Sequence, residues 1–149
     1  RSPNKSRAIE LTREAKRQRG LPLVGRVAAG VMHEAIEQND RRIELGEMFK
    51  GKNMFVLEVS GDSMIDANIQ DGDYVVIEPR ETAKTGDMVV ARTEDGEATL
   101  KYWHPEKNRI RLQPANSQMK PIYVRDARVV GVMVGVIRSV ESNHLNGEW

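Results

Sequence analysis

The strongest constraint on the fold of this chain is a series of short apolar segments separated by turn residues. Phe55, Leu57 and Val59 alternate with their neighbours at the period of a half-buried strand, which ends at Gly61-Asp62. Further strands are predicted at residues 74–78, 87–93, 98–103, 109–113 and 129–140, with turn sequences such as Asp71-Gly72-Asp73 between them. The pattern predicts a mainly β, barrel-like or sandwich-like domain with short helices.

Composition narrows the possible classes of protein. The 149 residues suffice for one domain with its own core, and 23 basic against 22 acidic side chains give a net charge of +1, which indicates no particular partner. The chain has no cysteine, which excludes disulfides, thiolate metal sites and a cysteine nucleophile. The longest apolar run, from Val129 to Ile137, has nine residues, about half of a membrane span. We therefore expect no contact with a membrane.

The first part of the chain differs from the rest. Its first twenty residues carry seven Lys or Arg and two Glu, which is typical of a solvated linker and less often of an arm that approaches nucleic acid. Residues 20–30 are apolar, small and interrupted by Pro and Gly, which predicts an extended segment. A short helix is predicted for residues 31–40, and residues 43–49 show no single clear period.

Several kinds of site are poorly supported. His33, His104 and His144 are far apart in the sequence, so no metal site is predicted. Asp66, Asp71 and Asp73 lack the spacing of a calcium loop and are interpreted as turn formers. No phosphate-binding glycine pattern occurs. We therefore expect no cofactor, and no small-molecule substrate.

Two residues could carry chemistry. Ser63 lies in a tight turn that follows the strand predicted at residues 55–59. Successive backbone N–H groups of such a turn can face one oxyanion. Lys101 shares a strand face with Thr99, and burial there would lower its pKa enough for it to act as a base. A Ser-Lys dyad is a known form of nucleophile and base, although residues of these types are nearly always structural.

The spacing of three motifs along the chain favours a catalytic Ser-Lys dyad over two structural residues. Ala28-Ala29-Gly30 precedes Val59-Ser60-Gly61-Asp62-Ser63-Met64, with 34 positions from Ala29 to Ser63, and Thr99-Leu100-Lys101 follows, 38 positions from Ser63 to Lys101. From residue 20 to 140 the chain strongly resembles the LexA family of self-cleaving repressors. The later sequences Pro114-Ala115-Asn116-Ser117 and Gly135-Val136-Ile137-Arg138 resemble landmarks of the same family.

The resemblance implies intramolecular proteolysis in a domain of the LexA and signal-peptidase type. It assigns the Ala29–Gly30 bond as the site of cleavage, Ser63 as the nucleophile and Lys101 as the base. Supporting roles fall to Thr99 beside the lysine, to the backbone N–H groups of Ser63 and Met64 as an oxyanion hole, and to Val27, which packs the cleavage segment into the site. Small side chains at positions 28–30 leave the scissile carbonyl open, which suits this chemistry.

The resemblance also implies how the domain is used. Residues 1–20 are expected to be a remnant of a DNA-binding wing with its linker, and residues 21–149 the self-cleaving and dimerising domain, with a cleavage segment at about 24–34. The expected partners are a second copy of the chain, a RecA filament on single-stranded DNA that stimulates cleavage in the SOS response, and operator DNA for a full-length repressor only. The expected location is the bacterial cytoplasm, at the nucleoid when full length.

Three alternatives stay open. A UmuD-like mutagenesis accessory has a similar length, but its usual cut follows Cys, whereas this chain has Ala29-Gly30. A non-catalytic β interaction domain would make Ser63 and Lys101 ordinary surface residues. A signal peptidase acting on other proteins uses a similar dyad but is disfavoured, since it would need a membrane anchor.

Overall fold

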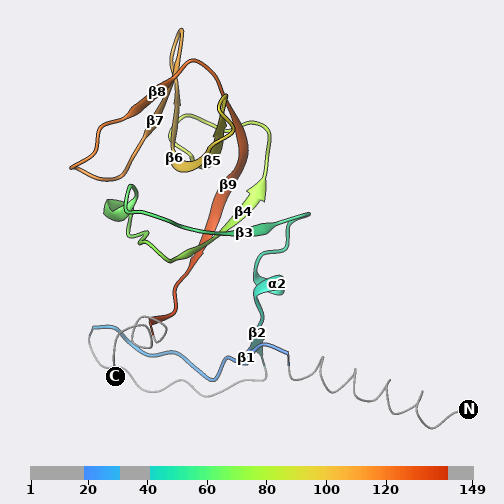
Figure 1. Cartoon of the computed structure of the whole chain (residues 1–149). Coiled ribbons are helices and arrows are strands. Elements are labelled where there is room, and N and C mark those ends of the chain that lie inside the picture. Colours follow the sequence, from blue (N-terminus) through green and yellow to red (C-terminus); the bar gives the residue numbers. More distant parts are fainter. Residues whose placement is uncertain (1–18, 31–40, 141–149) are drawn as a thin grey trace, which may run out of the picture. The chain divides into compact units, whose positions relative to one another are not determined.

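The computed structural model describes residues 19–30 and 41–140, and the chain divides between Lys50 and Gly51 into two units (Figure 1). The wing remnant expected before residue 19 and the helix expected at 31–40 lie outside the described residues, as does the second part of the cleavage segment.

The first unit is held by a very small sheet. β1 (Leu21–Pro22) pairs antiparallel with β2 (Arg42–Ile43), and α2 (Leu45–Met48) follows with one helical turn. Gly20 has a φ of +80°, and a Cβ at this position would lie 2.5 Å from the carbonyl oxygen of Ile43, so only glycine fits. The extended segment expected at 20–30 thus forms a strand only at its start, and residues 23–28 have no regular structure.

The second unit contains an antiparallel sheet of seven strands in the order β3-β4-β9-β5-β6-β7-β8. Its strands are β3 (Phe55–Glu58), β4 (Tyr74–Pro79), β5 (Met88–Thr93), β6 (Ala98–Pro105), β7 (Ile110–Gln113), β8 (Ile122–Val124) and β9 (Ala127–Ile137). One 3-10 helix, η1 (Ile65–Ala67), lies between β3 and β4. The expected mainly β class is confirmed.

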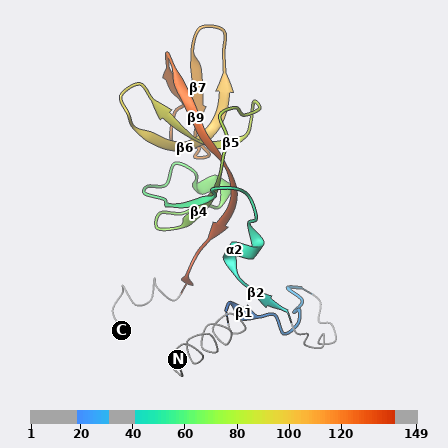
Figure 2. The same ribbon diagram turned by 90° about the vertical axis from the view of Figure 1, so that its right-hand side faces the viewer.

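β9 connects the two halves of this sheet (Figures 1 and 2). Its later residues, from Gly131 to Ile137, pair with β4, and its earlier residues, from Ala127 to Val132, pair with β5. The register shifts once in each pairing, as at a β-bulge, which bends a strand and increases its twist. Gly131 lies at the crossing, where a Cβ would come within 2.5 Å of Ile77. The eleven residues of β9 can therefore pair with β5 over the first part of the strand and with β4 over the later part.

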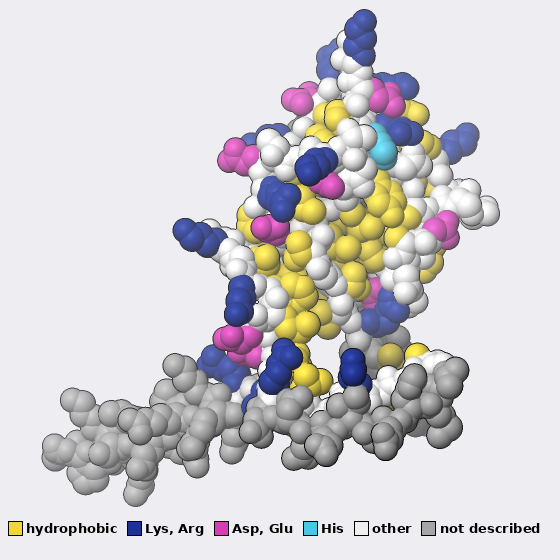
Figure 3. Space-filling view, turned by 180° about the vertical axis from the view of Figure 1, so that it is seen from behind, with side chains coloured by type: hydrophobic (Ala, Val, Ile, Leu, Met, Phe, Trp, Pro, Cys, Tyr) yellow, Lys and Arg dark blue, Asp and Glu magenta, His cyan; other side chains and the backbone are white. Residues whose placement is uncertain are grey.

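Two apolar cores form within the unit because strand side chains alternate between faces. One contains Met64, Ile69, Val75, Ile77 and Val90. The other contains Val89, Ala91, Trp103, Leu112 and Val129. Hydrophobic side chains also gather on one outer face of the unit, among charged ones (Figure 3). β3 and β8 end the strand order and are not paired with each other, so the sheet formed by the described residues is open, not a closed barrel.

The predicted strands are confirmed, with bounds that differ by a few residues. In the larger sheet, β8 is the one described strand that the sequence pattern did not predict. Its three residues are too few to show an alternation, and Ile122 and Tyr123 are both exposed. Pairing with β7 defines this strand, and such pairing is a property of the tertiary structure.

Candidate active site

Ser63 lies in the turn that leads from β3 to η1. Gly61 opens this turn with a φ of +93°, a left-handed conformation that favours glycine, and its N–H donates to the Asp71 carboxylate at 2.7 Å. After η1, Asn68 also has a positive φ, of 64°, and ends the helix. The turn residues predicted from the sequence therefore give the Ser63 segment its shape.

A second loop holds the backbone on both sides of Ser63. The carbonyl oxygen of Ser63 accepts a hydrogen bond from the N–H of Ala115 at 2.8 Å, and Ala115 in turn accepts from the N–H of Asp66 at 2.7 Å. The side-chain amide of Asn116 donates to the carbonyl oxygen of Asp62 at 2.9 Å. The serine is thus fixed from outside its own turn, by residues some fifty positions later in the chain.

Lys101 reaches the same place from β6. Its Nζ lies 3.1 Å from Oγ of Ser63 and 2.6 Å from Oγ1 of Thr99, and it donates a hydrogen bond to each. The side chain is buried, with the residue 6% exposed, and no carboxylate of the described chain pairs with it. Burial lowers the pKa of the Lys101 ammonium group below its ordinary value, since desolvation disfavours the charged form.

This geometry permits a specific proton transfer. A lysine without an anionic partner, held in an apolar environment, loses its proton more readily than an exposed one. The neutral amine could then accept the proton of the hydroxyl group that it contacts. The backbone N–H groups of Ser63 and Met64 have no hydrogen-bond partner within the described residues and are available to a developing oxyanion.

A groove of about 220 Å³ leads to these two side chains. Residues 57–60, at the end of β3, line one side of it, and residues 98–101, at the start of β6, line the other. β3 pairs only with β4, and residues 98–101 pair only with β5, so both segments have a free backbone edge. An extended peptide in the groove would find hydrogen-bonding groups on both sides.

The structure thus brings together four of the residues named from the sequence: Ser63, Lys101, Thr99 and Met64. The side chain of Met64 is itself buried in the first core, so only its backbone N–H is open to the site. Ala29 and Gly30 form a bend in the first unit, and Val27 precedes them in irregular chain. A metal-binding group of three His, Asp or Glu residues is not found in the described part of the chain.

Sequence reasoning missed two features around the site. The Asn116 amide that braces Ser63 lies in a segment noted only as a landmark. Asp73, interpreted as a turn former, also accepts two hydrogen bonds from Arg138, both at 2.7 Å, and is 2% exposed. These bonds hold the pKa of Asp73 below its usual range, against the desolvation that would raise it. An ion pair between residues 65 positions apart leaves no local signal in a single sequence.

Residues 22–134 match the Peptidase S24-like family. The LexA repressor of Geobacillus thermodenitrificans is 43% identical over 153 residues, which cover 94% of this chain and 72% of that protein. The LexA repressors of Bacillus velezensis and Staphylococcus aureus are 41% and 40% identical, again over 94% of this chain and 72% of theirs. The chain therefore belongs to the Peptidase S24-like family and, within it, to the family of the LexA repressors. None of the described helices is long and apolar enough to cross a membrane.

Proposed function

We propose that this chain is the self-cleaving part of a repressor of the SOS response, which inactivates itself by cutting the Ala29–Gly30 bond. The observation that carries the proposal is the hydrogen bond of 3.1 Å between Ser63 and a buried lysine that has no carboxylate partner among the described residues. A structural lysine would be expected at the surface or paired with an acid.

The proposed reaction has two stages. Neutral Lys101 takes the proton of the Ser63 hydroxyl as Oγ attacks the carbonyl carbon of Ala29. The oxyanion accepts hydrogen bonds from the N–H groups of Ser63 and Met64. When the C–N bond breaks, protonated Lys101 gives its proton to the departing amine of Gly30, leaving an ester between Ala29 and Ser63. Water then hydrolyses the ester with the same lysine as base, and the serine is restored.

Thr99 and Val27 have supporting roles in this proposal. Oγ1 of Thr99 lies 2.6 Å from the lysine Nζ and fixes the direction of the amine toward Ser63. Val27 stands two residues before the scissile carbonyl, where its apolar side chain would pack against the wall of the groove. That wall includes Leu57, Val59 and Leu100, so an apolar residue suits it.

Control follows from the tether between substrate and enzyme. A scissile bond in the same chain has a high effective concentration, so cleavage must be limited by a minor docked state of the segment at 24–34. We propose that a RecA filament on single-stranded DNA favours the docked state, and that cleavage then releases the regulated genes. Operator binding is assigned to the full-length repressor, in the bacterial cytoplasm at the nucleoid.

The proposed assembly is a homodimer formed through the C-terminal strand around residues 129–140, chiefly through the later part of β9. Val134 and Val136 are each 39% exposed on this strand, where uncovered apolar side chains favour contact with a second copy. Val134→Glu would be expected to convert a dimer into a monomer in sedimentation, whereas Ser139→Glu, just beyond the strand, would not. A parent chain that sediments as a monomer at all concentrations would contradict this assignment.

Intact mass tests the peptidase activity directly. Purified protein is incubated at mildly acidic and strongly alkaline pH, together with Ser63→Ala and Lys101→Ala. We expect fragments of 29 and 120 residues, formed faster at alkaline pH, where Lys101 is neutral, and absent from both variants. A chain that stays uncut under all conditions, including with RecA, ATP and single-stranded DNA, would favour a non-catalytic interaction domain.

A further inference from the structure

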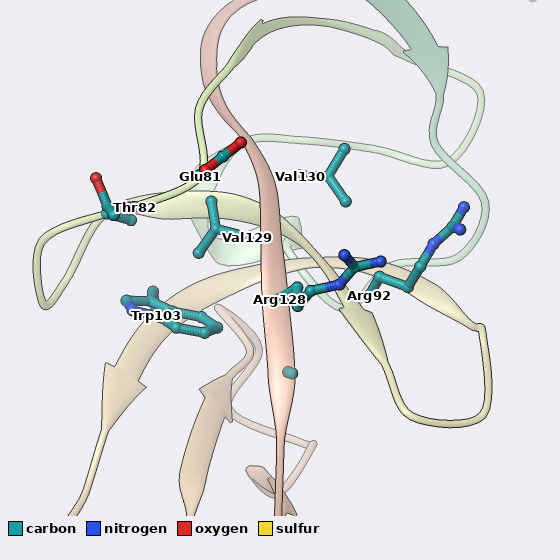
Figure 4. Close-up of a pocket in the computed structure, with 9 residues that line it drawn as sticks. Glu81, Thr82, Arg92, Trp103, Arg128, Val129 and Val130 are labelled. Atoms are coloured by element: carbon teal, nitrogen blue, oxygen red, sulfur yellow. The ribbon is translucent and has the colours of Figure 1, made fainter.

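A second hollow, of about 780 Å³, lies in the larger unit beside the first residues of β9 (Figure 4). It shares no lining residue with the groove at Ser63. Its walls come from residues 81–83, from Arg92 and Trp103, and from residues 127–130. None of these residues has a role in the proposed peptidase reaction, so we consider a separate binding function for the hollow.

The backbone at this hollow has a free strand edge. β4 ends at Pro79, opposite Gly131, while β9 begins four residues before Gly131, at Ala127. Residues 127–129 therefore pair with β5 on one side only. Apart from the N–H of Arg80, which donates to the Val130 carbonyl oxygen at 3.3 Å, no backbone group of the described chain bonds to the other side. Such an edge is a template for another strand.

Two arginines line one side of this edge. Arg92 of β5 and Arg128 of β9 are directly opposite each other in the register, and both are exposed. In Figure 4 both guanidinium groups lie on the same side of β9. Neither has an ion pair or hydrogen bond with any described residue. Like charges at directly opposed positions destabilise a sheet, and an anion between them would reverse that effect.

The other side of the edge holds two apolar residues of the hollow. Trp103 and Val129 belong to the second core, and each keeps 9% of its surface exposed at this hollow. Figure 4 shows both on the side of β9 away from the two arginines, with Thr82 above the indole. One side of the free edge thus carries both cations beside Val130, and the other carries the indole and Val129 together with Glu81 and Thr82.

We propose that this hollow binds an extended segment of a partner protein, which adds as a strand to the free edge of β9. Because strand side chains alternate between faces, the segment that fits has acidic residues at every second position, directed to Arg92 and Arg128. The residues between them are apolar and contact Trp103 and Val129.

The observations favour a peptide over a nucleic acid. Glu81 lies in the same hollow and would repel a chain of phosphates, whereas a peptide can direct an uncharged residue toward it. The free backbone edge matches the hydrogen-bonding pattern of another strand and has no counterpart in a nucleotide backbone. An apolar wall likewise suits aliphatic side chains.

Binding of a designed peptide tests the proposal. The probe is a blocked heptapeptide in which glutamate and valine alternate, and the protein carries Ser63→Ala to keep it intact and Trp149→Phe to leave Trp103 as the only indole. We expect saturable quenching or shift of Trp103 fluorescence below about 1 mM peptide, with protection of the Arg128 amide against hydrogen exchange.

Two control peptides and two double variants make the test specific. Replacing glutamate by lysine, or N-methylating alternate peptide bonds, should each weaken binding at least about tenfold, because one removes the charge complement and the other the strand pairing. The protein variant Arg92→Ser/Arg128→Ser should show the same loss. Lys107→Ser/Lys120→Ser removes equal charge from exposed positions outside the hollow and should bind normally.

Three results would overturn the proposal. The first is no binding of the glutamate peptide at 1 mM or above by either measurement, in a protein whose circular dichroism is that of the parent. The second is equal binding of the N-methylated peptide, which would exclude strand addition. The third is binding of an oligothymidylate that depends on Arg92 and Arg128 when the peptide does not bind, which would indicate a nucleic-acid site. None of these readouts depends on self-cleavage.

Discussion

Asp73 and Lys101 are both buried polar side chains of the same unit, yet their surroundings are opposite. Asp73 accepts hydrogen bonds from Arg138 and from the N–H of Gln70, so its charge is fully compensated. Within the described residues, the Lys101 ammonium group donates hydrogen bonds only to two hydroxyl groups. Compensation lowers the pKa of Asp73 and keeps it charged, whereas burial lowers the pKa of Lys101 and favours its neutral form. The arrangement at Asp73 stabilises the fold, whereas the arrangement at Lys101 favours a neutral amine that can act as a base.

The largest effect is expected at Lys101. Lys101→Ala should slow alkaline self-cleavage by at least about 10³-fold, because no other described group can take the serine proton. Lys101→Arg should be equally inactive, since a guanidinium stays protonated at pH values that neutralise a lysine. The measurement is the rate of appearance of the fragment from residue 30 onward, by mass spectrometry. Cleavage by the arginine variant at the parental rate would show that the lysine is not the base.

Arg138→Met tests the contribution of the Asp73 carboxylate, whose charge Arg138 compensates. It leaves the Asp73 carboxylate buried without its partner, so we expect the free energy of unfolding of the Ser63→Ala protein, measured in urea titrations, to fall by more than in the matched control. The matched control is Arg80→Met, which breaks the exposed pair with Glu78 and should cost less than about 1 kcal/mol. Equal losses in both variants would show that burial of Asp73 contributes nothing.

The pH dependence of this loss has a definite sign. Because the pKa of Asp73 is lowered in the folded state, its contribution is fully present above the unfolded value of about 3.9 and is lost as the pH falls through the folded value. The difference between Arg138→Met and the parent should therefore shrink below about pH 4. A difference that is unchanged at the lowest pH where both proteins fold would contradict the assignment.

Thr99→Val separates orientation of the lysine from its protonation. The change removes the hydroxyl oxygen that accepts from Nζ, so we expect the maximal cleavage rate to fall about tenfold, or 1.4 kcal/mol in the barrier. Loss of this acceptor also disfavours the ammonium form, so the rise in rate with pH should begin at a lower pH. Thr99→Ser keeps the oxygen and should behave as the parent. A slower rate with an unshifted pH profile in Thr99→Val would indicate a purely structural role.

The smallest effect is a gain in stability. Lys101→Met replaces a buried ionisable group by an apolar one of similar length, and should raise the free energy of unfolding by roughly 1 kcal/mol near neutral pH. Since the folded pKa is lowered, the cost of burying the lysine is fully present below that value and declines as the pH rises toward the unfolded value of about 10.4. The gain should decline in parallel, which denaturation at a series of pH values would measure. A loss of stability would mean that the two hydroxyl contacts outweigh desolvation.

Local patterns account for most of the agreement between sequence and structure. Six of the strands in the larger sheet were predicted because each alternates over several residues and is bounded by turn residues. Ser63 and Lys101 were named together from the spacing of motifs that resemble a known family, and their atoms are in contact. What was missed has no such pattern: three-residue β8, the Asn116 brace, and the Arg138–Asp73 pair.

The sequence by itself determined the mainly β class, the turn around Ser63, the absence of any cysteine chemistry, and the pair of residues proposed for catalysis. Periodicity and turn propensity are local properties, so a single chain can display them. Only the tertiary structure decided that Lys101 is buried without an acid among the described residues, that Asp73 is buried against Arg138, and that β9 leaves an edge free beside Arg92 and Arg128. Burial and strand pairing depend on residues distant in the chain, and these set the pKa of each group and the surfaces left open for a partner.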